Sequence, residues 1–345
     1  MLYITRAAAI LVCASAACFA QITSWSLAFG GVDAGTCSGY APGTTALSAG
    51  SMGFTYDAST ARLTLVVTNT SPTQPGFTTP LIGNVRFNVP TEAVTGMTLV
   101  SQTAAAGGPA NFGFTFDPDV RTNPNPNATK LNCFGSFNAA LTSAHPVNGT
   151  LMNASATSFS GSGHCLGSVT FEFDVTGPGT QWVTAGAFAQ SLSSGNGSGA
   201  FKVQAAFKTQ GMTDGSVSLS EEIGAAGGCA PVAYATGQNW PGGHMDLYVS
   251  GGPGCGGCLV FSFNPPPTII GGVSWDVGYP FFELLEVVTN GITHGGQLFS
   301  LPVDLPPIAG LVGLDLYFST ILYSPSTGGI YVSQNFRVTL IAPPL

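Results

Sequence analysis

The chain has 345 residues, of which only 7% are charged, against about 25% in typical soluble domains. It carries 16 acidic and 8 basic residues, a formal net charge of −8. It therefore lacks the basic surface that would neutralise the phosphates of a nucleic acid, and we expect no nucleic-acid partner. Although Gly and Pro are abundant, 44% of the residues are hydrophobic and 23 are Phe, which is enough apolar material to argue against a disordered chain.

The first twenty residues have the pattern of a secretory signal peptide. Arg6 is followed by an apolar run from Ala7 to Val12 and then by a small-residue cleavage site that ends at Ala20. The predicted mature chain begins at Gln21 and is secreted, either free outside the cell or held at the cell surface. No later run of 18 or more apolar residues is present, so the sequence predicts no membrane span.

The first half of the mature chain shows the two-residue alternation of apolar side chains that is typical of strands with one buried face. The clearest example is 169–175, where Thr170, Glu172 and Asp174 separate the apolar residues and are expected to face water. The other alternating stretches are 63–67, 85–89, 112–116 and 201–207. Short strands between turns rich in Gly, Pro, Asn and Ser predict an antiparallel, jelly-roll-like β-sandwich.

A cluster of oxygen-bearing side chains lies in one long loop of this half. The cluster consists of Asp117, Asp119, Asn123, Asn125 and Asn127. Ca²⁺ takes six to eight oxygen ligands from such loops, so calcium is the one cofactor that the sequence suggests. Arg121 stands where an EF-hand has its fifth-position ligand. We favour the competing interpretation, in which the Asp and Asn side chains bond to their own backbone.

The alternation stops in a stretch of small residues, where we place a linker at 223–228. It separates a predicted N-terminal domain, 21–222, from a predicted C-terminal domain, 229–345. The alternation then resumes at 245–249, 259–263, 314–318 and 336–340, which predicts a second antiparallel β-sandwich. The stretch 281–288 fits either a short helix or a buried strand. The expected fold is thus all-β, with two sandwiches in series.

The C-terminal third resembles a module that recurs in secreted proteins of planctomycete-type bacteria. The resemblance rests on a start rich in Cys and Gly near Cys229 and on the stretches 249–253, 301–306, 313–318 and 333–340. The family usually has a Gln soon after the Tyr of the third stretch, where this chain has Ser319 and Thr320. The resemblance implies a β-sandwich and residence at the surface or outside the cell, and it transfers no catalytic residue.

Removal of the signal peptide would leave six cysteines, an even number that predicts disulfides in an exported chain. They are Cys37, Cys133, Cys165, Cys229, Cys255 and Cys258. We prefer Cys133 with Cys165, and Cys229 with either Cys255 or Cys258, although the sequence does not fix the pairing. The last three cysteines with His244 also match a Cys₃His zinc set, and Cys255 and Cys258 form a Cys-x-x-Cys pair, but export favours a structural disulfide over metal or redox chemistry.

No catalytic constellation stands out. The chain has no Gly-x-Ser-x-Gly motif and only four histidines. Glu172 and Asp174 would share one face of a strand, but a pair of glycosidase carboxylates would need a cleft rather than an exposed sheet. We therefore predict that the protein is not an enzyme and keep a glycan-active hydrolase as a minor alternative.

Trp240 is the strongest candidate for a ligand contact. Asn239 and Pro241 flank it in an expected loop, where its ring could stack on a sugar, although large aromatics more often fill cores. The leading hypothesis is a non-enzymatic protein of the cell surface with a structural or binding role. The alternative is an extracellular carbohydrate-binding module that depends on calcium or not. Polysaccharide and cell-envelope components are the expected partners.

Overall fold

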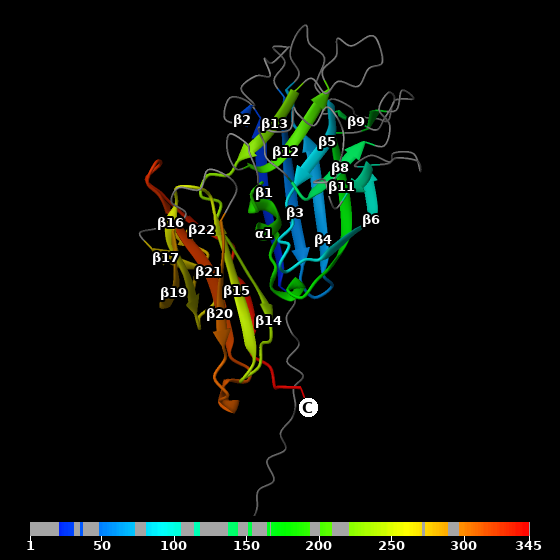
Figure 1. The fold of residues 1–345 in the computed structure, drawn as a ribbon. Coiled ribbons are helices and arrows are strands. Elements are labelled where there is room, and N and C mark those ends of the chain that lie inside the picture. Colours follow the sequence, from blue (N-terminus) through cyan, green and yellow to red (C-terminus); the bar gives the residue numbers. More distant parts are fainter. Residues whose placement is uncertain are drawn as a thin grey trace, which may run out of the picture.

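The computed structural model is nearly all β and confirms the predicted fold class (Figure 1). The described residues form two β-sandwiches, a short α-helix, α1 (Ala185–Gln190), and the 3₁₀ helices η4 (Thr180–Trp182) and η5 (Ala309–Leu311). The structure describes residues 21–30, 35–36, 48–72, 81–104, 114–117, 137–143, 151–153, 164–165, 167–193, 201–208, 221–270, 273–288 and 297–344. Within these ranges no helix has the length and apolar character needed to cross a membrane.

Two facing sheets make up the first sandwich. The front sheet has the order β1-β3-β4-β11-β6 and consists of β1 (Ile22–Gly30), β3 (Ala49–Asp57), β4 (Arg62–Asn69), β6 (Gly96–Ala104) and β11 (Ser168–Thr176). The back sheet has the order β10-β9-β5-β12-β13-β2, and β8 joins β7 to β5. Its strands are β2 (Gly35–Thr36), β5 (Leu81–Phe87), β7 (Phe114–Asp117), β8 (Ala139–Ser143), β9 (Leu151–Asn153), β10 (His164–Cys165), β12 (Phe201–Lys208) and β13 (Glu221–Ala226).

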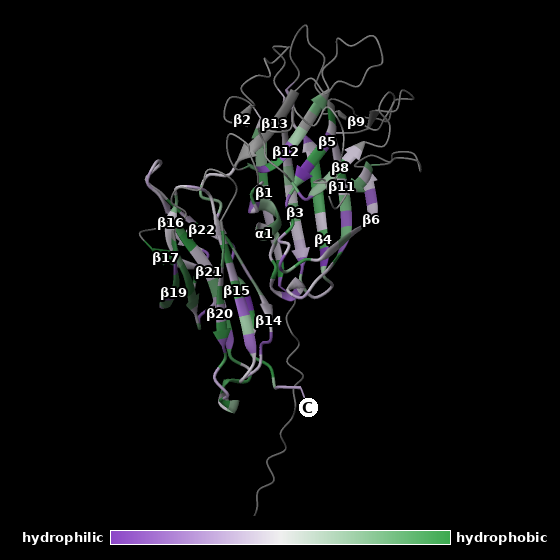
Figure 2. Cartoon of the chain, viewed as in Figure 1, coloured by the Kyte–Doolittle hydropathy of each residue, from purple (hydrophilic) through white to green (hydrophobic). Residues whose placement is uncertain are grey.

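Alternation places the apolar residues of the front sheet between the two sheets, as the sequence predicts. On β11, Phe171 and Phe173 are completely buried. Their rings meet the back sheet edge-on, with centroids 5.4 Å from Phe114 and 4.9 Å from Phe116. Full burial of a Phe side chain is worth about 1.5–3 kcal/mol, so the repeated pattern fixes the register of each strand. Hydrophobic and hydrophilic patches accordingly follow one another along the strands (Figure 2).

A three-stranded sheet faces a five-stranded sheet in the second sandwich. The smaller sheet consists of β14 (Val232–Gly237), β15 (His244–Gly251) and β20 (Gln297–Asp304). The larger sheet has the order β19-β16-β21-β22, with β23 also on β21, and consists of β16 (Gly256–Ser262), β19 (Phe281–Val288), β21 (Asp315–Ser324), β22 (Gly329–Val332) and β23 (Phe336–Thr339). A small hairpin pairs β17 (Thr268–Ile270) with β18 (Val273–Trp275).

The structure corrects the expectation for one stretch of the chain and decides between two alternatives for another. Most of the stretch 223–228, where we expected a linker, belongs to β13, which pairs with β12; sheet pairing overrides the weak strand preference of its small residues. The stretch 281–288 is a strand, β19, rather than a helix. A register shift between Leu259 and Val260, opposite β19, breaks the strict alternation, which is why the sequence alone also fitted a helix.

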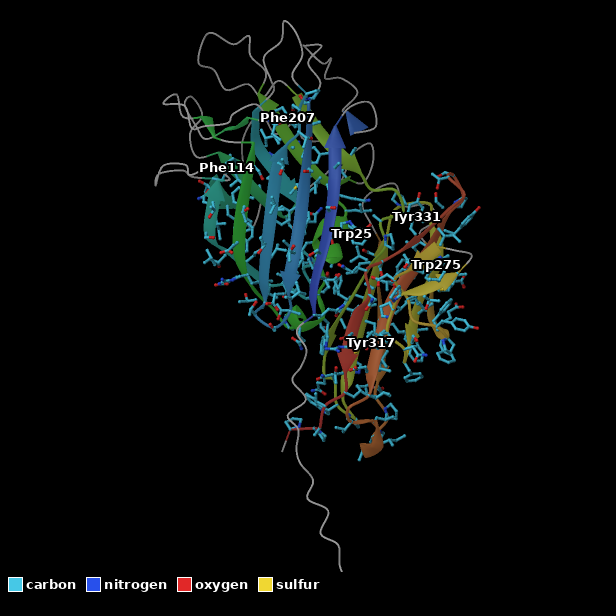
Figure 3. The ribbon with its side chains drawn as sticks, turned by 180° about the vertical axis from the view of Figure 1, so that it is seen from behind. Trp25, Phe114, Phe207, Trp275, Tyr317 and Tyr331 are labelled. Carbon is cyan, nitrogen blue, oxygen red and sulfur yellow. A yellow bond between two sulfur atoms is a disulfide. The ribbon has the colours of Figure 1, made fainter. Side chains whose placement is uncertain are left out.

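The two sandwiches meet along a seam formed by β1, α1 and the 3₁₀ helix η4 (Thr180–Trp182) on one side, and by β14 and the segment 333–337 on the other. Trp182 is buried among core residues of the second sandwich. Gln334 Nε2 donates to Ser24 O at 3.2 Å. Gln21 contributes a further pair of bonds, because its side chain donates to Asn335 O at 3.2 Å and accepts from Arg337 N at 3.3 Å. Figure 3 shows Trp25 on the part of the first sandwich nearest to the second.

Candidate functional site

The predicted calcium loop is almost entirely outside the described residues. Asp117 is the last residue of β7, and Asp119, Asn123, Asn125 and Asn127 fall in stretches that the structure does not describe. Among the described residues no three His, Cys, Asp or Glu side chains form a group that could hold a metal ion. The calcium site therefore stays a prediction.

The three cysteines of the second sandwich form one disulfide and leave one free thiol. Cys229 and Cys255 are bonded, and Cys258 on β16 is free and half-buried. The disulfide predicted for Cys229 is thus confirmed with Cys255 as the partner. Because both of these sulfurs are in the disulfide, the Cys₃His zinc set is not present. Burial raises the pKa of the Cys258 thiol, and the nearby carboxylates of Glu283 and Glu286 raise it further.

The other cysteine pairing cannot be read from the described residues. Cys37 and Cys133 lie outside them, and Cys165 is described only as the end of strand β10. The expected bond between Cys133 and Cys165 therefore also stays a prediction.

His244 lies at the start of β15 between two carboxylates. Its Nδ1 is 2.8 Å from Asp304 Oδ1 on β20, and its Nε2 is 3.6 Å from Asp246 Oδ1. The hydrogen bond to Asp304 is the main reason why the pKa of His244 is raised, and the charge of Asp246 adds to the effect. The ring is exposed, and both of its nitrogens face acceptors, so His244 is an ion-pair partner here rather than a general base.

The carboxylates of β11 are engaged with neighbours on the outer face of the front sheet. Glu172 Oε2 accepts from Ser101 Oγ at 2.8 Å, and Asp174 Oδ1 is 2.8 Å from Arg62 Nη2. As expected from the alternation, they face away from the core. Glu172 and Asp174 therefore make contacts between neighbouring strands on the surface of the sheet.

Trp240 is half-buried in the turn between β14 and β15. The turn is tight, because Gly243 N donates to Trp240 O at 2.8 Å and Gly242 N donates to Leu305 O at 2.9 Å. Asn239 Nδ2 also anchors it by donating to Thr339 O at 2.7 Å. The turn is thus anchored to both sheets of the second sandwich, and only part of the Trp240 side chain is exposed to a ligand.

An exposed aromatic cluster that the sequence did not single out lies at the edge of the larger sheet of the second sandwich. We define the edge cluster as Phe261 and Phe263, next to each other on one face around β16, with Phe282 of β19. The ring centroids are 5.4 Å apart for Phe261 and Phe263, 5.3 Å for Phe261 and Phe282, and 6.2 Å for Phe263 and Phe282. Phe263 is 48% exposed and Phe282 is 47% exposed.

The edge cluster continues a row of aromatic side chains that begins in the core. Strand register places Phe336 opposite Phe318, Phe318 opposite Phe261, and Phe261 opposite Phe282. Phe336 and Phe318 are buried between the two sheets. The inner face of the larger sheet therefore extends past its cover, and the last strand of the row presents its aromatic side chain to solvent.

β19 is the edge strand at this end of the sheet. Among the described residues it pairs only with β16. Glu283 and Glu286 are exposed on the opposite face of the strand, and Tyr279 just before it is 68% exposed. The edge thus combines unpaired backbone groups, an apolar inner face and an acidic outer face.

No protein-family model matches the chain, and no curated protein is significantly similar to it. The proposed function therefore rests on the geometry of the described residues.

Proposed function

We propose that the protein is a non-enzymatic extracellular or cell-surface protein, and that it binds a surface partner through the edge cluster of the second sandwich. The observation that carries the proposal is the exposure of Phe263 and Phe282 at the end of a row that is otherwise buried. Contiguous exposed apolar side chains at one place on a soluble domain are typical of interaction surfaces. Glu283 and Glu286 lie on the opposite face of the same strand, so the apolar surface of the edge cluster is confined to one face of β19.

The ring geometry favours a protein partner at this edge over a polysaccharide. The ring planes of Phe261 and Phe263 are inclined at 82°, and those of Phe263 and Phe282 at 65°. A sugar chain stacks best on rings that lie in one plane, whereas inclined rings form a pocketed apolar surface that side chains can fill. An apolar side chain or aromatic anchor of a surface protein fits this arrangement.

Several features support an extracellular location. The first twenty residues have the pattern of a signal peptide, and the bond between Cys229 and Cys255 is of the kind that persists in oxidising compartments. The resemblance of the C-terminal third to modules of secreted planctomycete-type proteins points the same way. On the outer face of the front sheet Arg62 and Asp174 form an ion pair, which suits a scaffold better than a reaction site.

The proposal is tested by retention of purified chain Gln21–Leu345 on cell-envelope material from the source cells and, separately, on insoluble polysaccharides. The double variant Phe263→Ser with Phe282→Ser removes the two most exposed rings of the edge cluster, and Ile341→Ser removes an exposed apolar residue elsewhere on the same sandwich. Phe282 and Phe263 are half exposed, so the double variant should fold. We expect the wild type and Ile341→Ser to be retained on the envelope and the double variant to be lost. Equal retention of all three would contradict the proposal.

A further inference from the structure

We infer that the partner of the edge cluster is an extended, positively charged segment of another protein, which pairs with β19 as an added strand. The inference rests on the proposed function, because it names the kind of partner that the same site takes. It is carried by the two faces of β19. Phe282 is exposed on the inner face, and the carboxylates of Glu283 and Glu286 are exposed on the outer face.

A register shift brings the two carboxylates onto one face of β19. Glu286 is paired with Cys258 on β16. Glu283 is paired with Val260, two residues further along the same strand. Leu284 is therefore an extra residue in β19, and it keeps both carboxylates on the outer face although they are three positions apart. In a regular strand, that odd separation would place them on opposite faces.

These two carboxylates have no partner among the described residues. The range 229–345 contains six acidic residues and a single basic one, Arg337. Four of the acids are bonded to other side chains, namely Asp246, Asp276, Asp304 and Asp315. Glu283 and Glu286 form no hydrogen bond or ion pair with another described residue. The outer face of this edge therefore carries negative charge that the described part of the sandwich does not neutralise.

Only a segment that lies along the edge can reach both features of β19 at once. Phe282 and the carboxylates are on opposite faces of the sheet, so a partner docked on one face would contact only one of them. A strand added beside β19 continues both faces, because its successive side chains alternate between them. It also pairs with the outward backbone groups of β19, which has β16 as its one neighbour among the described strands.

β19 is also better suited to strand addition than β20, the edge strand of the smaller sheet. β20 pairs only with β15 among the described strands, but it includes Pro302, which has no N–H to donate. β19 contains no Pro and no basic residue. Figure 1 shows β19 on the side of the second sandwich that lies away from the first. The first sandwich therefore leaves this edge accessible.

The charges of β19 disfavour a second copy of the chain and select a basic segment. A second β19 would bring two more carboxylates to the same face, and like charges opposite each other destabilise a strand pair. Lys or Arg residues at alternate positions would instead lie beside Glu283 and Glu286, while the apolar residues between them extend the edge cluster. The exposed ring of Tyr279 offers a further contact for a cation.

The test measures binding of short fluorescent peptides to the chain Gln21–Leu345 by fluorescence anisotropy. One peptide alternates Val and Lys, and a second alternates Val and Glu. Two more forms of the Val-Lys peptide are N-methylated, one on every Val and the other on every Lys. Because the N–H groups of a strand point to its two edges in turn, each methylated form lacks donors along one edge only.

Two double variants test the role of the carboxylates. Glu283→Gln with Glu286→Gln removes both charges from β19 with little change of shape. Glu172→Gln with Asp174→Asn is the matched control, since it removes two carboxylates from one outer strand face of the first sandwich. Thermal unfolding of each variant establishes that it is folded.

We expect the Val-Lys peptide to bind the wild type and the matched control equally, and the Val-Glu peptide to bind about tenfold more weakly or worse. Glu283→Gln with Glu286→Gln should weaken the Val-Lys peptide about fivefold, as expected for two exposed charge pairs. One methylated peptide should bind as the unmodified one does, and the other should not bind. No binding of the Val-Lys peptide, equal binding of the two methylated forms, or an affinity unchanged by the loss of both carboxylates would overturn the inference.

Retention on envelope material separates this inference from the proposed function. The proposed function predicts that Phe263→Ser with Phe282→Ser is lost from the envelope, and the inference predicts weaker retention of Glu283→Gln with Glu286→Gln as well. If the Phe variant is lost but the carboxylate variant is retained as the wild type is, the partner is not basic and only the inference fails. If the wild type itself is not retained, the proposed function fails, and the peptide measurements still decide whether the edge binds a basic strand.

Discussion

Gly186 and Gln334 are 148 residues apart and join the two sandwiches, since Gly186 N donates to Gln334 Oε1 at 2.8 Å. The same side chain donates to Ser24 O from its other end. Gly186 lies in the first turn of α1, where the helix faces the seam. A Cβ at this position would lie 3.0 Å from Gln334 Cβ and 3.1 Å from Gln334 Oε1. The close approach of the two sandwiches at this point therefore depends on the absence of a side chain at position 186.

Gln334→Ala should lower the free energy of unfolding by about 1–3 kcal/mol, because it leaves the buried Gly186 N–H without its acceptor. Denaturant unfolding followed by Trp fluorescence measures the change. Gln238→Ala is the control, since Gln238 is exposed and not in the seam, and it should change stability far less. If the two variants were equally stable, the seam bond would contribute nothing.

Gly186→Ala should also weaken the seam, because the new methyl group would meet Gln334 at a separation that real side chains seldom adopt. The double variant Gly186→Ala with Gln334→Ala removes the side chain that the methyl would meet. Its loss of stability should be smaller than the sum of the two single losses, as expected for residues in contact. Additive losses would argue against the contact.

The titration of His244 should report its two carboxylate neighbours. Its pKa is raised above the ordinary value of 6.5, chiefly by Asp304. A raised pKa means that protonation stabilises the fold, so this contribution is present in full below the unfolded-state pKa of 6.5 and is lost as the pH rises through the folded-state value. NMR titration of the imidazole should show a lower pKa in Asp304→Asn than in the wild type. An unchanged pKa would mean that the bond of 2.8 Å is not formed in solution.

Thiol chemistry should distinguish the three cysteines of the second sandwich. The two cysteines of the disulfide are 26 residues apart in the sequence, and the loop-entropy relation gives a stabilisation of about 3.5 kcal/mol for a loop of that length. Cys229→Ser with Cys255→Ser should therefore unfold at lower denaturant concentration than Cys258→Ser.

In the folded wild type, Cys258 should react slowly with a thiol reagent at neutral pH, because its raised pKa leaves little thiolate. Rapid labelling would contradict the burial that raises this pKa.

The row of aromatic side chains predicts that substitution by Ala lowers the free energy of unfolding less at the exposed end of the row than at its buried end. Phe336 is 1% exposed and Phe282 is 47% exposed. Phe336→Ala should therefore cost about 3–5 kcal/mol, whereas Phe282→Ala should cost about 1 kcal/mol or less, as half-exposed positions do. Thermal or denaturant unfolding of both variants gives the comparison. A large loss for Phe282→Ala would mean that this ring serves the core rather than a partner.

The sequence was sufficient for those parts of the fold in which alternation is regular. Val169, Phe171 and Phe173 were predicted to share a buried face, and they do. The sequence could not decide whether Cys255 or Cys258 is the partner of Cys229, because the two are only three residues apart and a disulfide depends on Cβ positions that spacing does not define. β13 was missed because its Gly and Ala residues carry no strand signal of their own.

The candidate sites were harder to predict, and for a physical reason. Phe261 and Phe263 alternate just as core residues do, and alternation says which face a side chain takes but not whether another sheet covers that face. Trp240, by contrast, was singled out because of its turn residues, and it does lie in a turn.

Hydrogen exchange with mass spectrometry of the chain Gln21–Leu345, free and bound to envelope material, tests the proposed function most directly. We predict that binding slows exchange in 256–263, which comprises β16 and Phe263, and in 281–288, which is β19, while β14 and the seam remain as they are in the free protein. Phe263→Ser with Phe282→Ser should abolish this protection. Unchanged exchange at β16 and β19 in a bound sample, or protection confined to the first sandwich, would contradict the claim that the second sandwich binds the partner through its exposed aromatic edge.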